Sequence, residues 1–526
     1  MRKKFIIISI ITLLAMGGVT LIWPPILWSL IVVGPLIALG IHDMVQKEHT
    51  IKRNFPLLGW GRYIMESLRP KVYQYFVESD VDGRPINRIF RSLVYQRAKG
   101  DLDTAPFGTQ VDVYRIGYEW MAHSLKAINY KRCNPDLRIL VGSGQCQQPY
   151  SASVLNISAM SFGALSKNAI LALNKGAHQG NFAHNTGEGG LSPYHLEGGG
   201  DIIWQIGTGY FGCRNQEGQF SSTAFEKNAL QEAVKMIEIK LSQGAKPGHG
   251  GILPGPKNTP EIARIRGVKP YNTVLSSPTH SAFNTPIGLL EFVAHLRELS
   301  GGKPIGFKLC IGRKAEFVAI CKAIVKTGIK PDFITVDGGE GGTGAAPMEY
   351  ANSVGMPLRD GLAFAVDCLR GFGLKEEIRV IASGKILSGF HLLKNMALGA
   401  DIGNSARGMM LALGCIQALE CNRNICPTGI TTQNPELVAG LAVEEKAPRV
   451  ARYHYDTVHS LIELLAAAGL EGLQDLDRSY IYRRVSSSEV RRYNEIFPPV
   501  EPGSFLGNDI PERYHQVVKS ASAQSF

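Results

Sequence analysis

Short β-rich apolar runs alternate with helix-like segments through the middle of this 526-residue chain. Amphipathic stretches such as KNAILALNKGAHQ and GLLEFVAHLREL separate most of the runs. Eight strands that alternate with helices at this spacing predict a closed (β/α)8 TIM barrel of the α/β class. A doubly wound sheet gives a similar alternation, but no G-x-G-x-x-G follows the first run. The eight predicted strands are residues 153–159, 181–186, 236–243, 271–278, 305–310, 331–338, 378–384 and 401–408.

The composition narrows the class of protein further. With 44% hydrophobic residues, 19% charged residues and 58 glycines, the chain has the profile of a globular α/β protein. The net charge is +11, but lysine and arginine are scattered without interleaved aromatic residues, so we expect no nucleic-acid binding. Nine cysteines without the spacing of a disulfide framework indicate a reducing compartment.

The N-terminal segment is apolar. No ionisable side chain occurs between Phe5 and Ile41, and Trp23–Pro25 divides this stretch into runs of 19 and 16 residues. Basic residues flank the pair on both sides, which keeps both ends in the cytoplasm by the positive-inside rule. We therefore expect a transmembrane helical hairpin that anchors a cytoplasmic catalytic domain to the cell membrane. The alternative is a cleavable signal peptide, with AMG at 15–17 as a poor processing site.

Glycine-rich loops follow most of the predicted strands, as in SAMSFGALS, NTGEGG, SQGAKPGHGG and DGGEGGTGAAP. Active sites of this fold lie at the carboxyl ends of the strands, so these loops predict a site where backbone N–H groups hold a bulky anionic ligand. The simpler explanation is that the glycines only permit tight turns. A phosphate site after strands seven and eight would use the backbone of Ser383, Gly384, Ser405 and Ala406, with charge from Arg407.

One lysine is expected inside the barrel. Lys308 ends the fifth predicted strand and faces the barrel axis, where an unpaired cation is costly to bury. The residue therefore needs either the electron-rich edge of a bound ligand or an ion pair with an acid such as Asp337.

Three cysteines stand close together in GCIQALECNRNICPTG, residues 414–429, at the spacing C-x5-C-x4-C. Thiolates at short spacing in a reducing compartment favour an iron–sulfur cluster or zinc. Zinc requires a fourth ligand, and this segment contains no histidine. Three buried structural thiols are the remaining alternative.

Long motifs in the chain closely resemble the FMN-binding synthase domain of glutamate synthase large chains. They are ISAMSFGALS, NTGEGG, SQGAKPGHGG, DGGEGGTGAAP and GCIQALECNRNICPTGITTQNPEL. The resemblance runs from about residue 145 to 440, and more weakly to 475. With its anchor, the whole chain resembles the stand-alone FMN-binding glutamate-synthase-like proteins of bacteria.

The resemblance implies two cofactors, FMN and a 3Fe-4S cluster held by Cys415, Cys421 and Cys426. It also implies reductive amination of 2-oxoglutarate by ammonia to give L-glutamate, with electrons from ferredoxin or a partner reductase. The residues expected to bind FMN are Ser158, Ala159, Met160, Ser161, Asn185, Lys308, Asp337, Gly338, Gly341, Gly342, Thr343, Gly344, Ser383, Gly384, Ser405, Ala406 and Arg407.

Four further residues match the substrate site of that family. Glu188 corresponds to the glutamate at the substrate carbonyl, where it handles protons or ammonia, and Lys246 and Arg266 correspond to the substrate-binding cations. Gln243 lies nearby, and Glu188 and Lys246 are the expected catalytic pair. The simpler roles are a loop-tethering acid for Glu188 and a helix-end surface charge for Arg266.

The chain departs from the family pattern at two places. No cysteine precedes Cys133, so we expect no glutaminase activity, and ammonia would come from solution or another subunit. GHGGILPG replaces the usual GEGGQLPG and puts His249 and Ile252 where the family has an acid and an amide. A related enzyme for another amine or keto acid, of the N-methylglutamate synthase type, is therefore the second hypothesis. A membrane-anchored redox component is the third, and a phosphate-binding barrel without flavin is the fourth.

The expected organisation has four parts. They are the hairpin at 1–43, a covering region at 44–144, the barrel with its cysteine loop at 145–440, and a helical C-terminal extension at 441–526.

Overall fold

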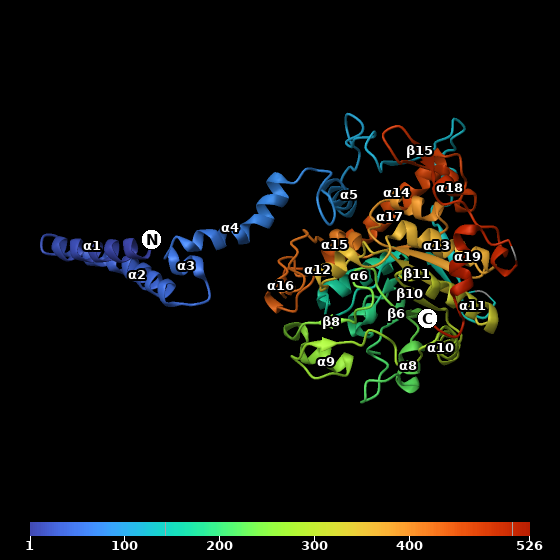
Figure 1. Ribbon diagram of the computed structural model, residues 1–526, viewed down its shortest axis with the longest axis horizontal. Coiled ribbons are helices and arrows are strands. Elements are labelled where there is room, and N and C mark those ends of the chain that lie inside the picture. Colours follow the sequence, from blue (N-terminus) through green and yellow to red (C-terminus); the bar gives the residue numbers. More distant parts are fainter. Residues whose placement is uncertain (143, 508) are drawn as a thin grey trace. The chain divides into compact units, whose positions relative to one another are not determined.

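The computed structural model describes residues 1–142, 144–507 and 509–526 (Figure 1). The chain forms two compact units, residues 1–87 and residues 88–526, and each is described by itself.

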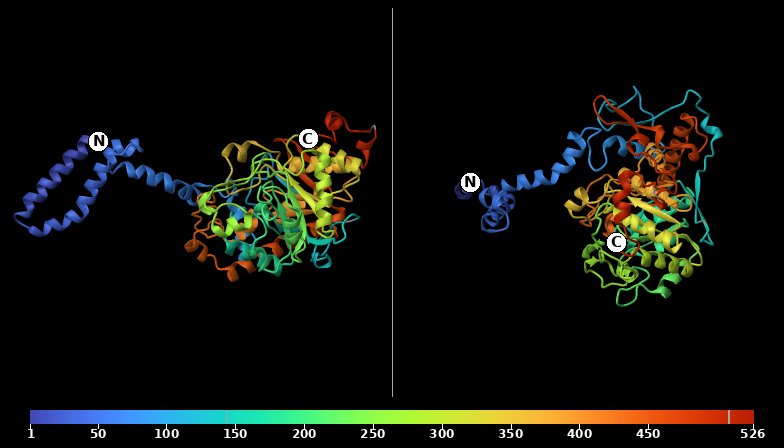
Figure 2. Two further views of the ribbon diagram at one scale, coloured as in Figure 1. Left: turned by 90° about the horizontal axis from the view of Figure 1, so that it is seen from below. Right: turned by 45° about the vertical axis from the view of Figure 1, so that its right-hand side comes forward.

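The first unit begins with two apolar helices that run side by side in opposite directions (Figure 2). They are α1 (Arg2–Thr20) and α2 (Leu30–Val45), joined through the 3-10 turn η1 (Pro24–Ser29). The helices pack closely where the ring of Phe5 lies against Gly40, because any side chain at Gly40 would overlap this ring. α1 ends where Trp23–Pro25 interrupts the helix, since proline lacks an N–H group and restricts the residue before it. Within the part of the chain that the structure describes, two helical segments are long and apolar enough to span a membrane, Arg2–Thr20 and Pro24–Val45.

Three shorter elements complete the first unit. They are α3 (Thr50–Asn54), α4 (Gly59–Val72) and the π-helical turn η2 (Tyr73–Val77).

The second unit is built around a closed barrel of eight parallel strands, which confirms the predicted (β/α)8 fold. Helices surround the strands (Figure 1). The barrel strands, in chain order and in order around the barrel, are β4 (Leu155–Ile157), β5 (His184–Asn185), β6 (Ile202–Ile206), β7 (Val234–Lys240), β10 (Ile305–Leu309), β11 (Phe333–Asp337), β12 (Arg379–Ser383) and β13 (Ile402–Ser405).

One predicted strand is not part of the barrel, and one barrel strand was not predicted. These two errors left the predicted number of strands at eight. The predicted strand 271–278 is not in the barrel; only β9 (Val274–Leu275) forms there, paired antiparallel with β8 (Ile252–Leu253). The missing barrel strand is β6, which lies between the second and third predicted strands, where we predicted no strand. All five residues of β6 are buried and four of them are apolar, as is typical of a parallel strand, but the glycines on both sides masked this short run.

The barrel helices begin and end at the expected capping residues. The Ser166 hydroxyl accepts a hydrogen bond from the N–H of Ala169 at the start of α6, and Gly328, at φ +72°, ends α11. The helices that follow the strands are α6 (Lys167–Gln179), α7 (Pro193–Leu196), α8 (Ser222–Ala229), α9 (Pro260–Arg266), α10 (Pro286–Leu299), α11 (Lys314–Thr327), α12 (Met348–Ser353), α13 (Leu358–Gly371), α14 (Gly389–Ala397) and α15 (Arg407–Leu413).

A hairpin closes the amino-terminal end of the barrel. β2 (Arg138–Val141) pairs antiparallel with β3 (Tyr150–Ser153), and Val141, Tyr150 and Ala152 join one apolar cluster with residues from the barrel strands. Because this end is plugged by packed side chains, the loops that can bind ligands are those at the opposite, carboxyl-terminal mouth.

Segments from both ends of the second unit pack beside the barrel. β1 (Glu119–Met121) pairs with β14 (Ile481–Arg484), which also pairs with β15 (Val490–Arg492). The other elements outside the barrel are α5 (Arg88–Lys99), α16 (Pro435–Ala439), α17 (Val443–Ala467), α18 (Tyr493–Ile496), α19 (Glu512–Ser520) and the 3-10 turns η3 (Tyr130–Arg132), η6 (Leu473–Asp475), η7 (Arg478–Tyr480) and η8 (Ser504–Leu506).

Glu119 joins these segments to the barrel. Its carboxylate accepts hydrogen bonds from Arg359 (3.0 Å) and Lys394 (3.0 Å), and it also pairs with Arg483 of β14. Burial acts to raise the pKa of this carboxyl, but the cations, Lys394 first, outweigh it and lower the pKa from 4.5 to about 2.

We predict that Glu119→Gln lowers the free energy of unfolding by about 3–5 kcal/mol, because it leaves three cations without their carboxylate. Because the folded pKa lies below the unfolded one, this stabilisation is complete above pH 4.5 and disappears as the pH falls through about 2. Denaturant unfolding of both proteins between pH 3 and 7 measures the difference. Glu489→Gln, at an exposed pair with Arg491, is the control and should change stability by less than about 0.5 kcal/mol. If both substitutions change the free energy of unfolding by the same small amount, the proposed role of Glu119 is contradicted.

Candidate active site at the carboxyl-terminal mouth of the barrel

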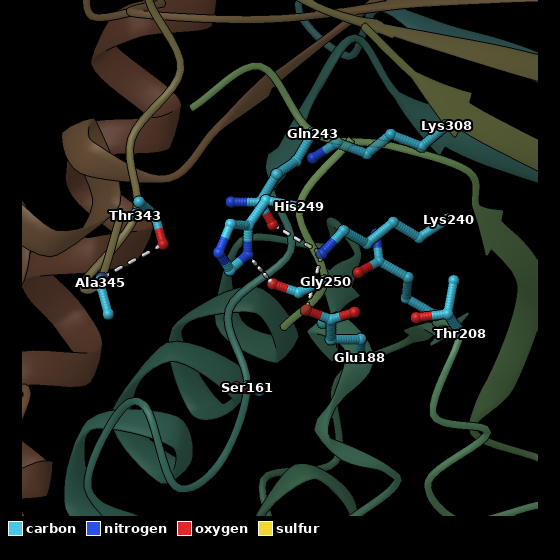
Figure 3. Close-up of polar contacts among 12 residues, drawn as sticks. Ser161, Glu188, Thr208, Lys240, Gln243, His249, Gly250, Lys308, Thr343 and Ala345 are labelled. Atoms are coloured by element: carbon cyan, nitrogen blue, oxygen red, sulfur yellow. Dashed lines mark hydrogen bonds and ion pairs between the residues drawn. The ribbon is translucent and has the colours of Figure 1, made fainter. Parts of the chain in front are cut away.

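An acid and a lysine form the centre of the site at this mouth (Figure 3). Glu188 lies in the 3-10 turn η4 (Gly187–Gly189) after β5, and Lys240 is the last residue of β7. Lys240 Nζ is 2.7 Å from Glu188 Oε1 and 2.6 Å from Gln243 Oε1. Burial acts to raise the pKa of Glu188, but Lys240, then Lys246 and Arg266, outweigh it and lower the pKa. Glu188 is therefore an ionised carboxylate at neutral pH.

Lys246 is a buried cation without a direct partner. The residue is 3% exposed, and its Nζ makes no hydrogen bond or ion pair with any residue that the structure describes. Burial, and then the nearby charge of Lys240, lowers its pKa from 10.5 to about 8, against the opposite effect of Glu188.

Arg266, at the end of α9, is incompletely paired as well. Its Nη2 donates to the carbonyl oxygen of Phe162 at 3.2 Å and, more weakly, to Ser161 Oγ at 3.5 Å, while its buried Nε has no partner among the described residues. The guanidinium lies 5.0 Å from the centre of the Phe211 ring. Burial lowers its pKa to about 10, and Glu188 acts in the opposite direction.

A small cavity of about 40 Å³ lies beside Glu188 and Arg266. Glu188, Arg266 and Phe211 line one part of it, and the β8–β9 ribbon covers the other. The backbone at Gly250, just before β8, lies very close to the backbone at Ser276, just after β9, because a Cβ at Gly250 would overlap the Ser276 carbonyl oxygen. The lining residues are Ser161, Ala164, Glu188, Phe211, Gly251, Ile252, Leu253, Arg266, Val274 and Ser276.

Ile252 and His249, the two residues that depart from the family pattern, have different surroundings. Ile252 lines the cavity, where it adds to an apolar wall. The His249 ring instead packs edge-on against Tyr350, with Nδ1 2.9 Å from the carbonyl oxygen of Gly250 (Figure 3).

Lys308 forms the ion pair that was the alternative to a ligand contact, with its Nζ 3.4 Å from Asp337 Oδ2. The same carboxylate oxygen accepts a hydrogen bond from the Gly244 N–H at 2.7 Å. Burial acts to lower the pKa of Lys308, but the charges of Asp337 and Glu238 outweigh it and raise the pKa. Gly244 admits no side chain, since a Cβ there would overlap the Gly338 carbonyl oxygen. The loops after β7 and β11 are thus held together by backbone contacts at the mouth.

Backbone donors remain available after β12 and β13. Among the described residues, no acceptor lies within hydrogen-bond distance of the N–H groups of Gly384, Ala406, Arg407 or Gly408. Ser158 and Ser383 lie beside them, with their hydroxyl oxygens 3.3 Å apart. This group of N–H donors has the character of a phosphate site.

Arg407 lies against the loop after β11. Its Nη2 donates to the Glu340 carbonyl oxygen at 2.5 Å, and a Cβ at Gly342 would be 2.9 Å from its Nε. Burial lowers the pKa of Arg407.

The remaining residues predicted to bind the cofactor occupy three settings. Asn185 lies in the barrel interior, where its amide donates to Glu238 at 2.8 Å. The backbone at Met160 and Ser161 packs so closely on Gly187 that a Cβ there would lie 2.8 Å from the Ser161 nitrogen. The others, Ala159, Ser405, Gly338, Gly341, Thr343 and Gly344, belong to the loops after β4 and β11 and to the end of β13, at the same mouth.

The three cysteines lie in the loop between α15 and α16. Cys415 and Cys421 are partly exposed and Cys426 is buried. Burial raises the pKa of Cys415 to about 12; at Cys426, hydrogen bonds from Thr428 and Thr431 outweigh burial and lower the pKa. Among the residues that the structure describes, no three histidine, cysteine or acidic side chains are grouped to hold a metal ion.

A buried lysine that the sequence did not identify ties this loop to the rest of the site. Lys257, in the 3-10 turn η5 (Gly255–Lys257) after β8, is 3% exposed. Its Nζ donates to the carbonyl oxygens of Cys421 (2.7 Å), Thr431 (2.7 Å) and Ala164 (3.3 Å). The segment that covers the cavity is therefore fastened directly to the cysteine loop.

His280, also not predicted, holds the end of β7. Its Nε2 donates to the Lys240 carbonyl oxygen at 2.9 Å, since a carbonyl can only accept, and its Nδ1 accepts from the Tyr210 hydroxyl at 3.0 Å. Burial lowers the pKa of His280 to about 4, so the ring is neutral.

The chain is similar to proteins of one family over most of its length. Residues 127–471 match the family described as the conserved region in glutamate synthase. The chain is 37% identical over 495 residues to the glutamate synthase large subunit-like protein YerD of Bacillus subtilis, which covers 87% of this chain and 94% of that protein. It is also 37% identical over 321 residues to the archaeal NADPH glutamate synthase of Methanocaldococcus jannaschii, 61% of this chain and 60% of that one.

These matches define the class of protein as an oxidoreductase. The chain belongs to the glutamate synthase family. It spans only 18% of the NADPH glutamate synthase large chain of Bacillus subtilis, at 34% identity over 285 residues. Among solved structures, the flavin-binding domain of baker's yeast flavocytochrome b2 matches with a TM-score of 0.43 and 11% identity, over 88% of this chain and 94% of that chain.

We predict that Lys257→Met loosens the cysteine loop, because it leaves three buried carbonyl oxygens without their donor, at about 1–3 kcal/mol for each unsatisfied group. Hydrogen exchange of residues 414–431 should accelerate at least about tenfold, while exchange in the core of α11 stays unchanged. Lys326→Met, at an exposed position in α11, is the control and should leave residues 414–431 as in the wild type. Unchanged hydrogen exchange of residues 414–431 in the Lys257→Met variant would contradict the role of Lys257 in holding the cysteine loop.

Proposed function

We propose that this chain is an FMN- and iron–sulfur-dependent enzyme that makes L-glutamate from 2-oxoglutarate and ammonia. The observation that carries the proposal is the positive charge around Glu188. Lys240, Lys246 and Arg266 surround the single carboxylate Glu188, a surplus of two positive charges. A dicarboxylate balances this surplus, and Lys246 and Arg266, which lack acidic partners in ion-pair contact, are the groups free to bind it.

FMN fits the donors present at the mouth. The free N–H groups at Gly384, Ala406, Arg407 and Gly408 suit its phosphate, and Lys308 supplies a cation beside the barrel axis for the electron-rich edge of the ring. When bound, FMN would supply a hydride to the substrate carbon.

The chain's own residues account for binding and proton transfer. Arg266 and Lys246 bind the two carboxylates and fix the keto carbon near Glu188. Glu188, ionised at neutral pH, accepts a proton from the amine during condensation, and Lys240 Nζ holds its Oε1 in place. The β8–β9 ribbon covers the cavity and excludes water from it.

The cysteine loop has the donor chemistry for the 3Fe-4S cluster. It offers three thiols, and the lowered pKa of Cys426 favours the thiolate that binds iron. A cluster of several irons keeps its sulfur ligands further apart than one metal ion does, so the lack of a single-ion site among the described residues is compatible with it. Bound there, the cluster would relay electrons from ferredoxin or a reductase.

A second candidate substrate pair is favoured by the apolar wall of the cavity. Ile252, Leu253 and Val274 give a surface that accommodates a methyl group better than a polar amide would. Methylamine in place of ammonia, with N-methylglutamate as product, therefore belongs in the same test.

We also propose that α1 and α2 form a hairpin in the cell membrane. α1, and η1 together with α2 (Pro24–Val45), are each long and apolar enough to span it, and the flanking basic residues keep both ends, and hence the barrel, in the cytoplasm. The flanking residues are Arg2, Lys3, Lys4, Lys47, Lys52 and Arg53.

The reaction is tested by reoxidation of the pre-reduced flavin with a panel of 2-keto acids, each with no amine, ammonium or methylammonium. We expect 2-oxoglutarate with ammonium to react fastest, and Glu188→Gln to slow this reaction about 10²–10⁴-fold. Glu217→Gln, at an exposed loop position, is the matched control and should react at the wild-type rate. Equal rates with monocarboxylic keto acids, or rates independent of amine, would contradict the proposal, and a preference for methylammonium would select the second candidate.

The pKa of Lys246 gives a pH dependence with a defined sign. A lysine with a pKa of about 8 is charged below this pH and neutral above it, so kcat/KM for 2-oxoglutarate should fall as the pH rises through about 8. Lys246→Arg keeps its charge and should move the fall to higher pH, whereas Lys246→Met should have a high KM at every pH. A wild-type profile that rises between pH 7 and 9 would refute the role of Lys246.

A further inference from the structure

The helix α4 carries an apolar stripe that is largely exposed. Its residues Trp60, Ile64, Leu68 and Val72 follow one another at intervals of four and therefore lie on one face, with Met65 beside them. Ile64 is 51% exposed, Met65 69% and Val72 47%. Single exposed apolar residues are ordinary, but a continuous stripe along a helix marks a surface that binds something.

The start of α4 is fixed beside the end of the apolar helix α2. Asp43, near the end of α2, is 1% exposed. Its carboxylate accepts hydrogen bonds from the Leu57 N–H at 3.0 Å and from Trp60 Nε1 at 3.1 Å. α4 thus begins at the level where α2 ends, and Trp60 lies at this boundary, a position that tryptophan favours at membrane surfaces.

Basic side chains accompany the stripe. Lys52 Nζ lies 3.3 Å from the centre of the Trp60 ring, and Arg69 and Lys71 are exposed in the last turn of α4. Arg62, also exposed, pairs with Glu66 at 2.6 Å. Cations next to an exposed apolar face complement a surface of anionic phospholipids, because the acyl region takes the apolar residues and the headgroups take the charges.

We propose that α4 lies in the plane of an anionic lipid surface, with its apolar stripe between the acyl chains and its basic residues at the headgroups. This inference rests on the proposed membrane hairpin of α1 and α2 and adds a second, in-plane contact to it. A second copy of the chain fits the face less well, since two such helices packed together would place their arginines and lysines near one another.

The test uses the full chain in lipid nanodiscs and measures hydrogen exchange of residues 59–72. A free helix of this length is marginally stable in water, so its amides exchange quickly unless the membrane holds it. We expect exchange in wild type to be at least about tenfold slower than in Leu68→Glu, which places a charge in the stripe. Ser67→Glu adds the same charge beside the stripe and is the matched control, so it should stay close to wild type.

Lipid composition tests the role of the cations. The protection should be several-fold greater in discs with anionic lipid than in purely zwitterionic discs, and Arg69→Gln with Lys71→Gln should remove this increment. Equal exchange in wild type, Leu68→Glu and Ser67→Glu would overturn the inference. Protection that appears only when two chains occupy one disc would also overturn it, in favour of a second copy.

Alkaline carbonate extraction of cell membranes separates this inference from the hairpin. We expect wild type and Leu68→Glu to remain in the membrane fraction, because α1 and α2 hold them there. If the wild-type chain stays in the membrane fraction but α4 is not protected from hydrogen exchange, only the proposal of an in-plane helix is overturned. Release of the wild-type chain together with an unprotected α4 would overturn both proposals.

Discussion

The functional site depends on an excess of buried positive charge at one mouth of the barrel. Its effect is clearest at Lys246, whose pKa falls from 10.5 to about 8. A shift of this size means that the site disfavours the charged lysine by about 3 kcal/mol. Glu188 offsets part of this cost, whereas the charge of Lys240 adds to it. A bound carboxylate would offset the remainder, so the same charges favour an anionic substrate.

One segment of the chain organises most of this site. Between β7 and β9 it carries Lys246, the cavity residue Ile252, the clamp Lys257 and the cation Arg266. Lys257 fastens the segment to the cysteine loop through the carbonyl oxygens of Cys421 and Thr431, and to the loop after β4 through that of Ala164. The residues proposed to bind substrate and those proposed to bind the cluster therefore cannot move independently. This connection offers a physical reason for the dense packing of glycine backbone at the mouth, as at Gly244 and Gly250.

The sequence predicted the architecture well because hydrophobic alternation is a local property. It missed β6, since glycine and polar residues on both sides masked a short buried strand, and it placed a strand at 271–278 where only a two-residue ribbon forms. Motif positions such as Glu188 and Arg266 could be predicted to share a site. Lys240 and Lys257 could not, because their importance arises from partners distant in sequence: Glu188 for the one, and the carbonyl oxygens of Ala164, Cys421 and Thr431 for the other. The Lys308–Asp337 pair was one of two alternatives, because an unpaired lysine inside a barrel is costly and needs either a ligand or an acid.

The most direct test of the account is a structure of the FMN-loaded protein with bound 2-oxoglutarate. The account predicts that the dicarboxylate occupies the cavity under the β8–β9 ribbon, with one carboxylate at Lys246 Nζ, the other at the Arg266 guanidinium, and its keto carbon beside Glu188. A ligand bound elsewhere, or one that leaves Lys246 and Arg266 without a carboxylate partner, would contradict it.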